Sequence, residues 1–95
     1  MGRIESYLGF AVRSGKIVYG MDNIETSRRR LYALVLGPDA SVNLAERAER
    51  YAARRNVPLI KAEKPLEELI RKPNCKLVAL LDANMAKAVI SSVGR

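Results

Sequence analysis

The sequence contains no histidine and no tryptophan, and it has one cysteine and one phenylalanine. Without histidine the chain cannot form the common imidazole acid–base sites, and a single cysteine excludes zinc sites built from several Cys or His ligands. We therefore expect a protein that is not an enzyme, with no metal site and no cofactor. The one thiol, Cys75, is expected to be a small buried group and indicates a reducing compartment.

Long apolar runs are also missing. No segment approaches the ~18 consecutive apolar residues of a membrane span. The first residues, "MGRIESYLGF", lack the apolar core of a signal peptide. We therefore expect a cytoplasmic protein with no membrane partner.

Acidic residues are scarce relative to basic ones. The 95 residues include 17 Lys and Arg against 10 Asp and Glu, which gives a formal charge of +7. A compact basic domain favours polyanions as partners. Hydrophobic residues make up 48% of the chain, a globular balance that predicts one folded domain over residues 1–95, expected to be monomeric.

The spacing of apolar residues predicts five helices that alternate with four strands. The helices are expected over residues 3–15, 22–30, 41–56, 65–72 and from 82 onward; the strands are expected over residues 16–19, 31–36, 57–61 and 75–82. This alternation predicts one mostly parallel sheet between two helical layers.

Particular residues support these boundaries. Ser41 and Asp82 are suited to cap the third and fifth helices, and either Asp22 or Asn23 is suited to cap the second. Pro58 places the third strand at a sheet edge. The inward face of the last helix is expected to carry four apolar residues. They are Ala86, Val89, Ile90 and Val93.

These segments resemble the small bacterial relatives of ribosomal protein L-seven-Ae. The resemblance covers residues 7–92, and its most specific parts are "GFAVRSGKIVYG", which ends at Gly20, and "LVLGPDAS", which precedes the third helix. The wider family, with L-thirty-e, has an α/β/α sandwich and typically binds kink-turn RNA. The resemblance implies a three-layer sandwich with a central four-stranded mixed sheet. It also implies a non-catalytic protein whose partner is structured RNA, kink-turn or ribosomal, and not DNA.

In that family the turn after the first strand reads Gly-x-Asn-Glu-x-x-Lys. The helix that follows donates backbone N–H groups to an RNA phosphate, the amide and carboxylate read sheared G·A pairs, and the Lys takes another phosphate. The matching positions here are Gly20, Met21, Asp22, Asn23 and Thr26. Gly20 is the family residue, whereas Asp22 replaces Asn, Asn23 replaces Glu and Thr26 replaces Lys.

The chemistry of these replacements differs. An ionised Asp22 only accepts hydrogen bonds and adds a negative charge close to phosphates, whereas Asn23 keeps a donor and an acceptor for a base edge. Asp22 is therefore the departure that opposes standard kink-turn recognition most directly.

Because Thr26 stands where the family has Lys, a positive charge is missing at this position. Cations nearby in the sequence are candidates to replace it. Arg28, Arg29 and Arg30 follow within about a turn of the expected helix, and three consecutive residues span ~300°, so one or two of them, taken as Arg29 and Arg30, are expected to reach a phosphate. The alternative is a solvated helix end whose cations favour the helix dipole. Lys16 is either a surface lysine or a further phosphate contact.

The family's second RNA surface is the loop between the fourth helix and the fourth strand, which covers an extruded base with small apolar groups. The matching stretch here is "RKPNCKL". Its candidate RNA-binding residues are Arg71, Lys72, Pro73, Asn74 and Cys75, of which Pro73 and Cys75 supply apolar contact and Arg71 and Lys72 supply charge.

Two functions stay open on these grounds. The first is an RNA-binding module that is ribosome- or translation-associated. The second is a protein-interaction module on the same scaffold, because the signature residues have changed and a fold does not fix a function. The arginines of the third helix are interpreted as a solvated face, since Glu46 and Glu49 interleave with them.

Overall fold

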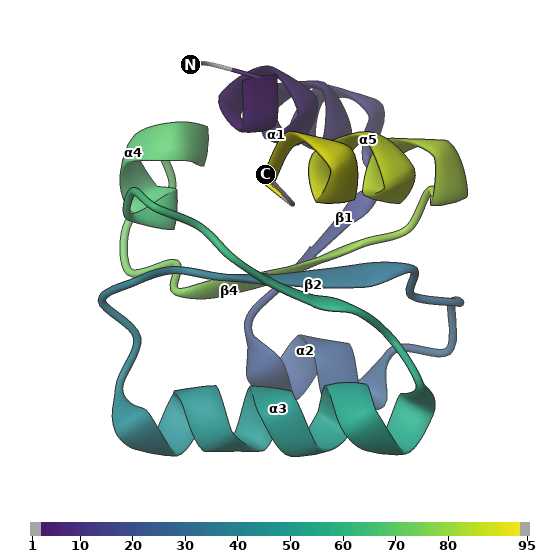
Figure 1. Ribbon diagram of the computed structural model, residues 1–95, viewed down its shortest axis with the longest axis vertical. Helices are drawn as coiled ribbons and strands as arrows, with labels where there is room; N and C mark the ends of the chain where they lie inside the picture. Colours follow the sequence, from purple (N-terminus) through teal and green to yellow (C-terminus); the bar gives the residue numbers. More distant parts are fainter. Residues whose placement is uncertain (1–2, 94–95) are drawn as a thin grey trace.

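The computed structural model describes residues 3–93, which form five helices alternating with four strands (Figure 1). The helices are α1 (Arg3–Ser14), α2 (Met21–Thr26), α3 (Val42–Arg55), α4 (Leu66–Ile70) and α5 (Ala83–Val93). The strands are β1 (Ile17–Tyr19), β2 (Ala33–Leu36), β3 (Leu59–Lys61) and β4 (Leu77–Leu80). The predicted order of elements is confirmed.

The four strands form one sheet in the order β1-β4-β2-β3. β2 and β3 are parallel, whereas β4 is antiparallel to both β1 and β2. The sheet is therefore mixed, as the family resemblance implies, and the mostly parallel sheet predicted from the alternation of elements is wrong.

The lengths of the connecting helices explain the strand directions. α3 has 14 residues and rises about 21 Å, which returns the chain to the starting end of β2 so that β3 runs parallel to it. α4 has 5 residues and rises only about 7.5 Å. The chain therefore leaves β3 and enters β4 at the same end of the sheet, and β4 runs in the opposite direction. The order of helices and strands alone does not contain this information.

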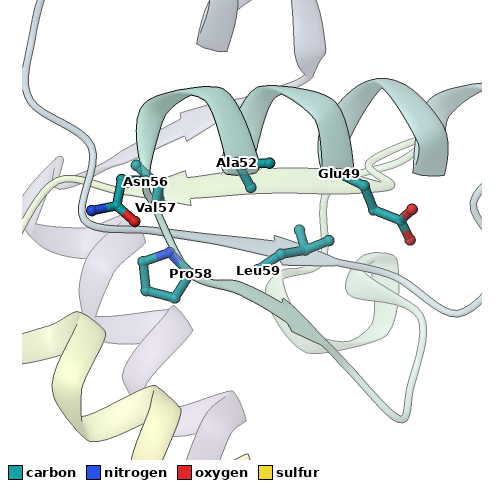
Figure 2. A pocket seen from close by; sticks show the side chains of 7 residues that line it. Glu49, Ala52, Asn56, Val57, Pro58 and Leu59 are labelled. Atoms are coloured by element: carbon teal, nitrogen blue, oxygen red, sulfur yellow. The ribbon is translucent and has the colours of Figure 1, made fainter.

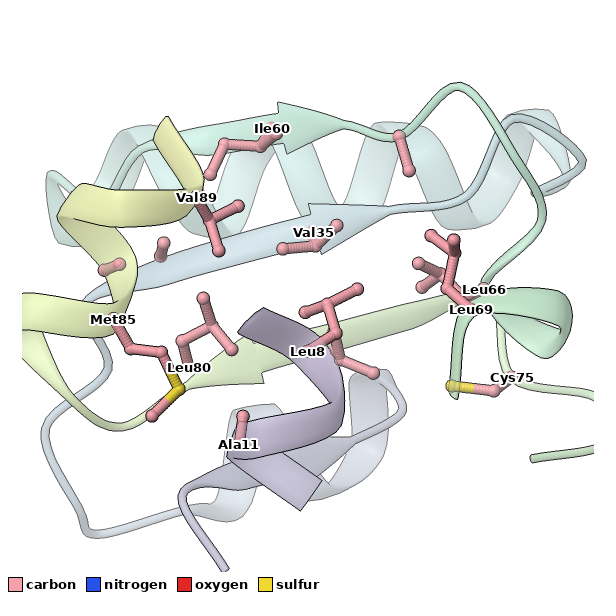
Figure 3. Close-up of a cluster of buried hydrophobic side chains, with 14 residues drawn as sticks. Leu8, Ala11, Val35, Ile60, Leu66, Leu69, Cys75, Leu80, Met85 and Val89 are labelled. Atoms are coloured by element: carbon pink, nitrogen blue, oxygen red, sulfur yellow. The ribbon is translucent and has the colours of Figure 1, made fainter. Parts of the chain in front are cut away.

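Helices cover both faces of the sheet, which makes a three-layer α/β/α sandwich (Figure 1). α1, α4 and α5 lie on one face, and α2 and α3 lie on the other. The residues of β2 are all buried and alternate between two apolar clusters. In the cluster of the first face, Leu8, Leu66 and Val89 from the three helices pack against Val35 and Leu80 of the sheet (Figure 3).

Two of the predicted helix caps are confirmed. The hydroxyl of Ser41 accepts a hydrogen bond from the Leu44 N–H at 3.1 Å, and the carboxylate of Asp82 accepts one from the Met85 N–H at 3.0 Å. The predicted cap of the second helix at Asp22 or Asn23 is wrong, because α2 already begins at Met21.

The inward face of α5 is partly as predicted. Ala86 and Val89 are buried, but Ile90 is 37% exposed, so it lies at the border of the apolar face. The side chain of Val93 lies outside the described residues.

The largest local difference from the sequence prediction follows α2. This helix ends at Thr26 rather than near Arg30, and β2 begins at Ala33 rather than at Leu31. Residues 27–32 are therefore an irregular connection that holds all three consecutive arginines. The Leu31 side chain is buried, at 8% exposure, and fixes this connection to the α2–α3 face of the sheet.

Candidate nucleic-acid interface

Gly20 makes the turn between β1 and α2. Its φ of 83° and ψ of 152° lie in a region that side-chain-bearing residues rarely adopt. Its N–H donates to the Leu77 carbonyl at 2.9 Å, and its carbonyl accepts from the Ile24 N–H at 3.0 Å. A Cβ placed on Gly20 would meet no atom within 4 Å, so the space in front of this backbone is open. The turn therefore requires glycine for its conformation and leaves room for a ligand.

The residues after Gly20 face different surroundings. The Met21 side chain is 5% exposed and packs in the core between the sheet and α3, so only the backbone of this residue can contact a ligand. The Asp22 side chain is 94% exposed and lies 3.5 Å from an Arg47 nitrogen. The amide nitrogen of Asn23 donates to the Tyr19 carbonyl at 2.9 Å, so its oxygen is available as an acceptor. Thr26 is exposed and donates its hydroxyl to the Asp22 carbonyl at 3.0 Å.

The second predicted segment is a tight loop between α4 and β4. Arg71 and Asn74 both have left-handed backbones, with φ of 57° and 60°. The side chains of Arg71, Lys72, Pro73 and Asn74 are exposed. The Asn74 N–H donates to the Glu67 carboxylate, which holds the loop against α4.

Cys75 differs from the rest of this loop. Its thiol is buried among the apolar side chains between the sheet and α4, and burial raises its pKa above the ordinary value. The expectation of a buried thiol is confirmed. The expectation that Cys75 supplies apolar contact to a base is wrong, because its side chain points into the core; Pro73 is the exposed apolar residue of the loop.

The structure brings these two segments together. Tyr19 pairs with Val78 across β1 and β4, and the Lys72 Nζ lies 4.7 Å from the centroid of the Tyr19 ring. We call the face formed by residues 19–23 and 71–74 the turn surface. Tyr19 is the member of this surface that the sequence analysis missed. The one sequence feature that could have indicated Tyr19 is its place as an aromatic residue directly before Gly20.

The cations in and beside the turn surface differ in whether they form ion pairs. Lys76, just beyond the loop, donates to the carboxylates of Asp39 and Glu67, and these bonds raise its pKa. Arg71 and Lys72, by contrast, form no ion pair within residues 4–92. Partial burial raises the pKa of the Tyr19 hydroxyl, so this group remains neutral at physiological pH. The turn surface therefore presents the cations of Arg71 and Lys72 beside a neutral phenol, together with the exposed carboxylate of Asp22.

Among the predicted site residues, Lys16, Arg29 and Arg30 lie toward the other end of the sheet from the turn surface. The Lys16 carbonyl accepts from the Leu81 N–H, and the N–H of Tyr32, close to Arg29 and Arg30, donates to the Leu80 carbonyl. Both contacts are at the end of the sheet opposite to Gly20, which bonds to Leu77 at the start of β4. α2 has six residues and rises about 9 Å between the two ends. The expectation that Arg29 and Arg30 follow Thr26 on a continuing helix is wrong, because α2 ends at Thr26. Their contact with RNA stays a prediction.

Two other kinds of feature, a metal-binding cluster and a membrane-spanning helix, are absent from the described part of the chain. Residues 3–93 contain no group of three His, Cys, Asp or Glu side chains placed to hold a metal ion. Within the same residues, no helix has both the length and the apolar character needed to cross a membrane.

Comparison with known proteins bears on the fold. No family model matches the sequence, and no curated protein matches it. The chain is similar to the solved structure of a protein with unknown function from Bacillus halodurans, with a TM-score of 0.87, 15% sequence identity and 100% coverage of both chains. At 15% sequence identity, the similarity between the two structures is evidence for the fold alone. It supports the α/β/α sandwich over the full length of the chain.

Proposed function

We propose that this protein binds RNA without catalysing a reaction and that it recognises a kink-turn or a similarly kinked, structured RNA at the turn surface. In this proposal the protein is a monomer of the cytoplasm, associated with the ribosome or with translation. It needs no cofactor or metal, and neither DNA nor membrane is its partner.

One observation carries the proposal: the Gly20 turn and the 71–74 loop lie side by side, joined by the contact of Lys72 with Tyr19. The family resemblance assigns RNA contacts to both stretches, although they are far apart in the sequence. A single RNA can therefore reach the open backbone at Gly20 and the exposed side chains of Arg71 and Pro73 together.

The polar groups of the turn surface suit a nucleic acid. Arg71 and Lys72 can contact phosphates, and the free oxygen of Asn23 can accept from a base amino group. A kinked RNA presents two backbones at an angle, which fits a surface made of two segments. Recognition by shape and phosphate contacts needs no catalytic group.

A titration with two RNAs tests the proposal. We expect a kink-turn to bind at least ~10-fold more tightly than a straight duplex of equal length, a difference of about 1.4 kcal/mol. With several phosphates neutralised, log affinity should fall with log salt at a slope of roughly −3 to −4. A salt-independent affinity would contradict the phosphate contacts.

Two matched pairs of variants test the location. Gly20→Ala and Gly15→Ala both place a side chain at a positive φ, of 83° and 71°, but Gly15 lies at the other end of β1. Similarly, Lys72→Ala and Lys87→Ala each remove one exposed cation, the second from α5. Only the Gly20 and Lys72 variants should reduce the preference for the kink-turn. Equal effects within each pair would place RNA binding elsewhere.

A protein-interaction module is the alternative, and one observation favours it. The 94% exposed Asp22 carboxylate stands at the start of α2, where an RNA phosphate would meet a like charge. Equal affinity for the kinked and the straight RNA would support this alternative, because binding would then depend on net charge alone.

A further inference from the structure

A second basic surface lies at the end of the sheet opposite to the turn surface. The connection 27–32 and the C-terminal turn of α3 enclose an open pocket of about 600 Å³. Four arginines and two tyrosines line it: Arg28, Arg29, Arg30, Arg55, Tyr32 and Tyr51. We call this the arginine pocket.

The segment that follows α3 forms another wall of the arginine pocket. Asn56 ends α3 with a left-handed backbone, and Val57 and Pro58 lead from it into β3 (Figure 2). The same three residues border a groove of about 590 Å³ between α3 and the edge strand β3. The arginine pocket and this groove therefore share one wall, and both are open to solvent.

The charge of the arginine pocket is of one sign. No aspartate or glutamate lines it. The ion pairs within residues 4–92 involve the cations of Arg47, Lys61 and Lys76 and none of the four pocket arginines. The guanidinium groups therefore keep donors for an external anion, and the planar guanidinium matches a phosphate in a bidentate manner.

Two carbonyls at the end of α3 have backbone partners and not arginine partners. Cations often gather at a helix C-terminus to satisfy its last carbonyls. Here the carbonyls of Ala52 and Ala53 already accept from the backbone N–H groups of Asn56 and Val57. These two carbonyls therefore do not need the arginines as hydrogen-bond donors.

Two of the guanidinium groups lie over aromatic rings. Arg30 lies 5.3 Å from the centroid of the Tyr32 ring, and Arg55 lies 5.2 Å from that of Tyr51. The Tyr51 ring is 4% exposed, and its hydroxyl donates to the Ile24 carbonyl at 3.4 Å, which fixes the ring between α2 and α3. Stacking of this kind orients a guanidinium while leaving its N–H edge free.

We infer that the arginine pocket is a second RNA-binding site, which takes the phosphodiester backbone of the same RNA that the turn surface binds. This inference rests on the proposed function. The pocket is assigned to phosphates because its guanidinium groups match phosphate oxygens and its lining includes no carboxylate that would repel them. Phosphate contacts carry no sequence information. The turn surface then selects a kinked RNA, and the arginine pocket adds affinity for its backbone.

A charge-matched pair of double variants tests the inference. Arg30→Gln/Arg55→Gln removes one guanidinium from each wall of the pocket. Arg50→Gln/Arg54→Gln removes the same charge from exposed positions of α3 that do not line it. Affinity for the kink-turn and for the straight duplex is measured from low to high salt, and thermal melts establish that both variants are folded.

We expect the pocket variant to lose at least ~10-fold in affinity for both RNAs at low salt, with a salt slope shallower by about 2, since each phosphate contact contributes about 0.9. The ratio between the two RNAs should stay unchanged. The α3 variant should lose less than ~3-fold. Arg30→Lys/Arg55→Lys should keep the slope but bind more weakly than wild type, because Lys has no fork geometry.

The outcomes separate the two ideas. Equal losses for the pocket and α3 variants would overturn the second site, whatever the turn surface does. A wild-type protein without kink-turn preference, combined with a selective loss in the pocket variant, would overturn the proposed function and leave the arginine pocket as an RNA site. No RNA binding by the wild type would overturn both.

Discussion

The Lys72 ammonium lies over the Tyr19 ring, 4.7 Å from its centroid, so the loop after α4 is in contact with the last residue of β1. This contact depends on the antiparallel pairing of β1 with β4, which places Tyr19 opposite Val78. An exposed cation–π contact contributes only about 0.5–1 kcal/mol. The sheet, rather than this contact, therefore holds the two halves of the turn surface together.

The backbone of Gly20 leads to a prediction on stability. Gly20→Ala should lower the free energy of unfolding by about 1–3 kcal/mol, because alanine resists a φ of 83° even though nothing blocks its Cβ. Gly9→Ala is the opposite case. Gly9 lies within α1, its added Cβ would be 3.5 Å from an Arg13 nitrogen, and alanine favours a helix, so stability should rise by up to about 1 kcal/mol. Urea unfolding of the two variants checks both signs; a Gly20→Ala protein as stable as the wild type would contradict the positive φ.

Much of the sandwich was predictable from local pattern. Apolar periodicity located the helices, and the Ser41 and Asp82 caps are local interactions that a sequence displays directly. The strand directions were not predictable in this way. They depend on α4 having 5 residues, and its expected range of 65–72 was too long.

The candidate site was predictable in part. The Gly20 turn followed from the sequence and the family resemblance together, and its positive φ agrees with the need for glycine. The placement of the three arginines could not be predicted from the sequence, because α2 ends at Thr26 without a glycine or proline to mark its end. The burial of Leu31, a tertiary contact, draws the chain away from the helical path. The arginine pocket needs Arg55 from α3 beside this connection, a proximity that no local pattern encodes.

The buried thiol of Cys75 gives a prediction on reactivity. The thiolate is the reactive form, and burial both raises the pKa of this thiol and blocks access to it. At pH 8, iodoacetamide should modify the native protein at least ~10-fold more slowly than the protein in urea. Mass spectrometry of timed samples measures both rates. Equal rates would mean that the loop opens readily and that Cys75 is not part of the core.

The pairing of Lys76 with Asp39 gives a prediction on pH. The hydrogen bond from Lys76 lowers the pKa of the Asp39 carboxyl below 3.8, and the same bond raises the pKa of Lys76 above 10.5. Because the pKa of Asp39 is lower in the folded protein, this carboxylate stabilises the fold above its unfolded-state pKa, and the stabilisation is lost as the pH falls through its folded-state pKa. Because the pKa of Lys76 is higher in the folded protein, this ammonium stabilises the fold below pH 10.5, and the stabilisation is lost as the pH rises through its folded-state pKa. Lys76→Met should therefore melt at a lower temperature than wild type at pH 7, and this difference should shrink below pH 3.8.

Lys61→Met is the control for this pH dependence. Its Nζ lies 3.7 Å from a Glu49 oxygen, with both side chains more than half exposed, and such pairs contribute little to stability. The melting temperature of this variant should follow that of the wild type across the same pH range. A pH-independent difference between Lys76→Met and wild type would show that Lys76 stabilises the fold through packing and not through its charge.

The carboxylate of Asp22 gives the last prediction. Asp22→Asn should strengthen binding of a kink-turn RNA by about 1 kcal/mol, or about fivefold, because it removes a negative charge near phosphates and restores a donor. Stability should change little: Asp22 is 94% exposed, it does not cap α2, and Arg47 keeps its shorter contact of 2.7 Å with Glu25. Glu46→Gln, which makes the same charge change at an exposed position of α3, separates a local effect from one of net charge. Gel-shift titrations of both variants should show the gain for Asp22→Asn alone. An equal gain in both would indicate that the RNA responds to the overall charge of the protein and does not lie against the start of α2.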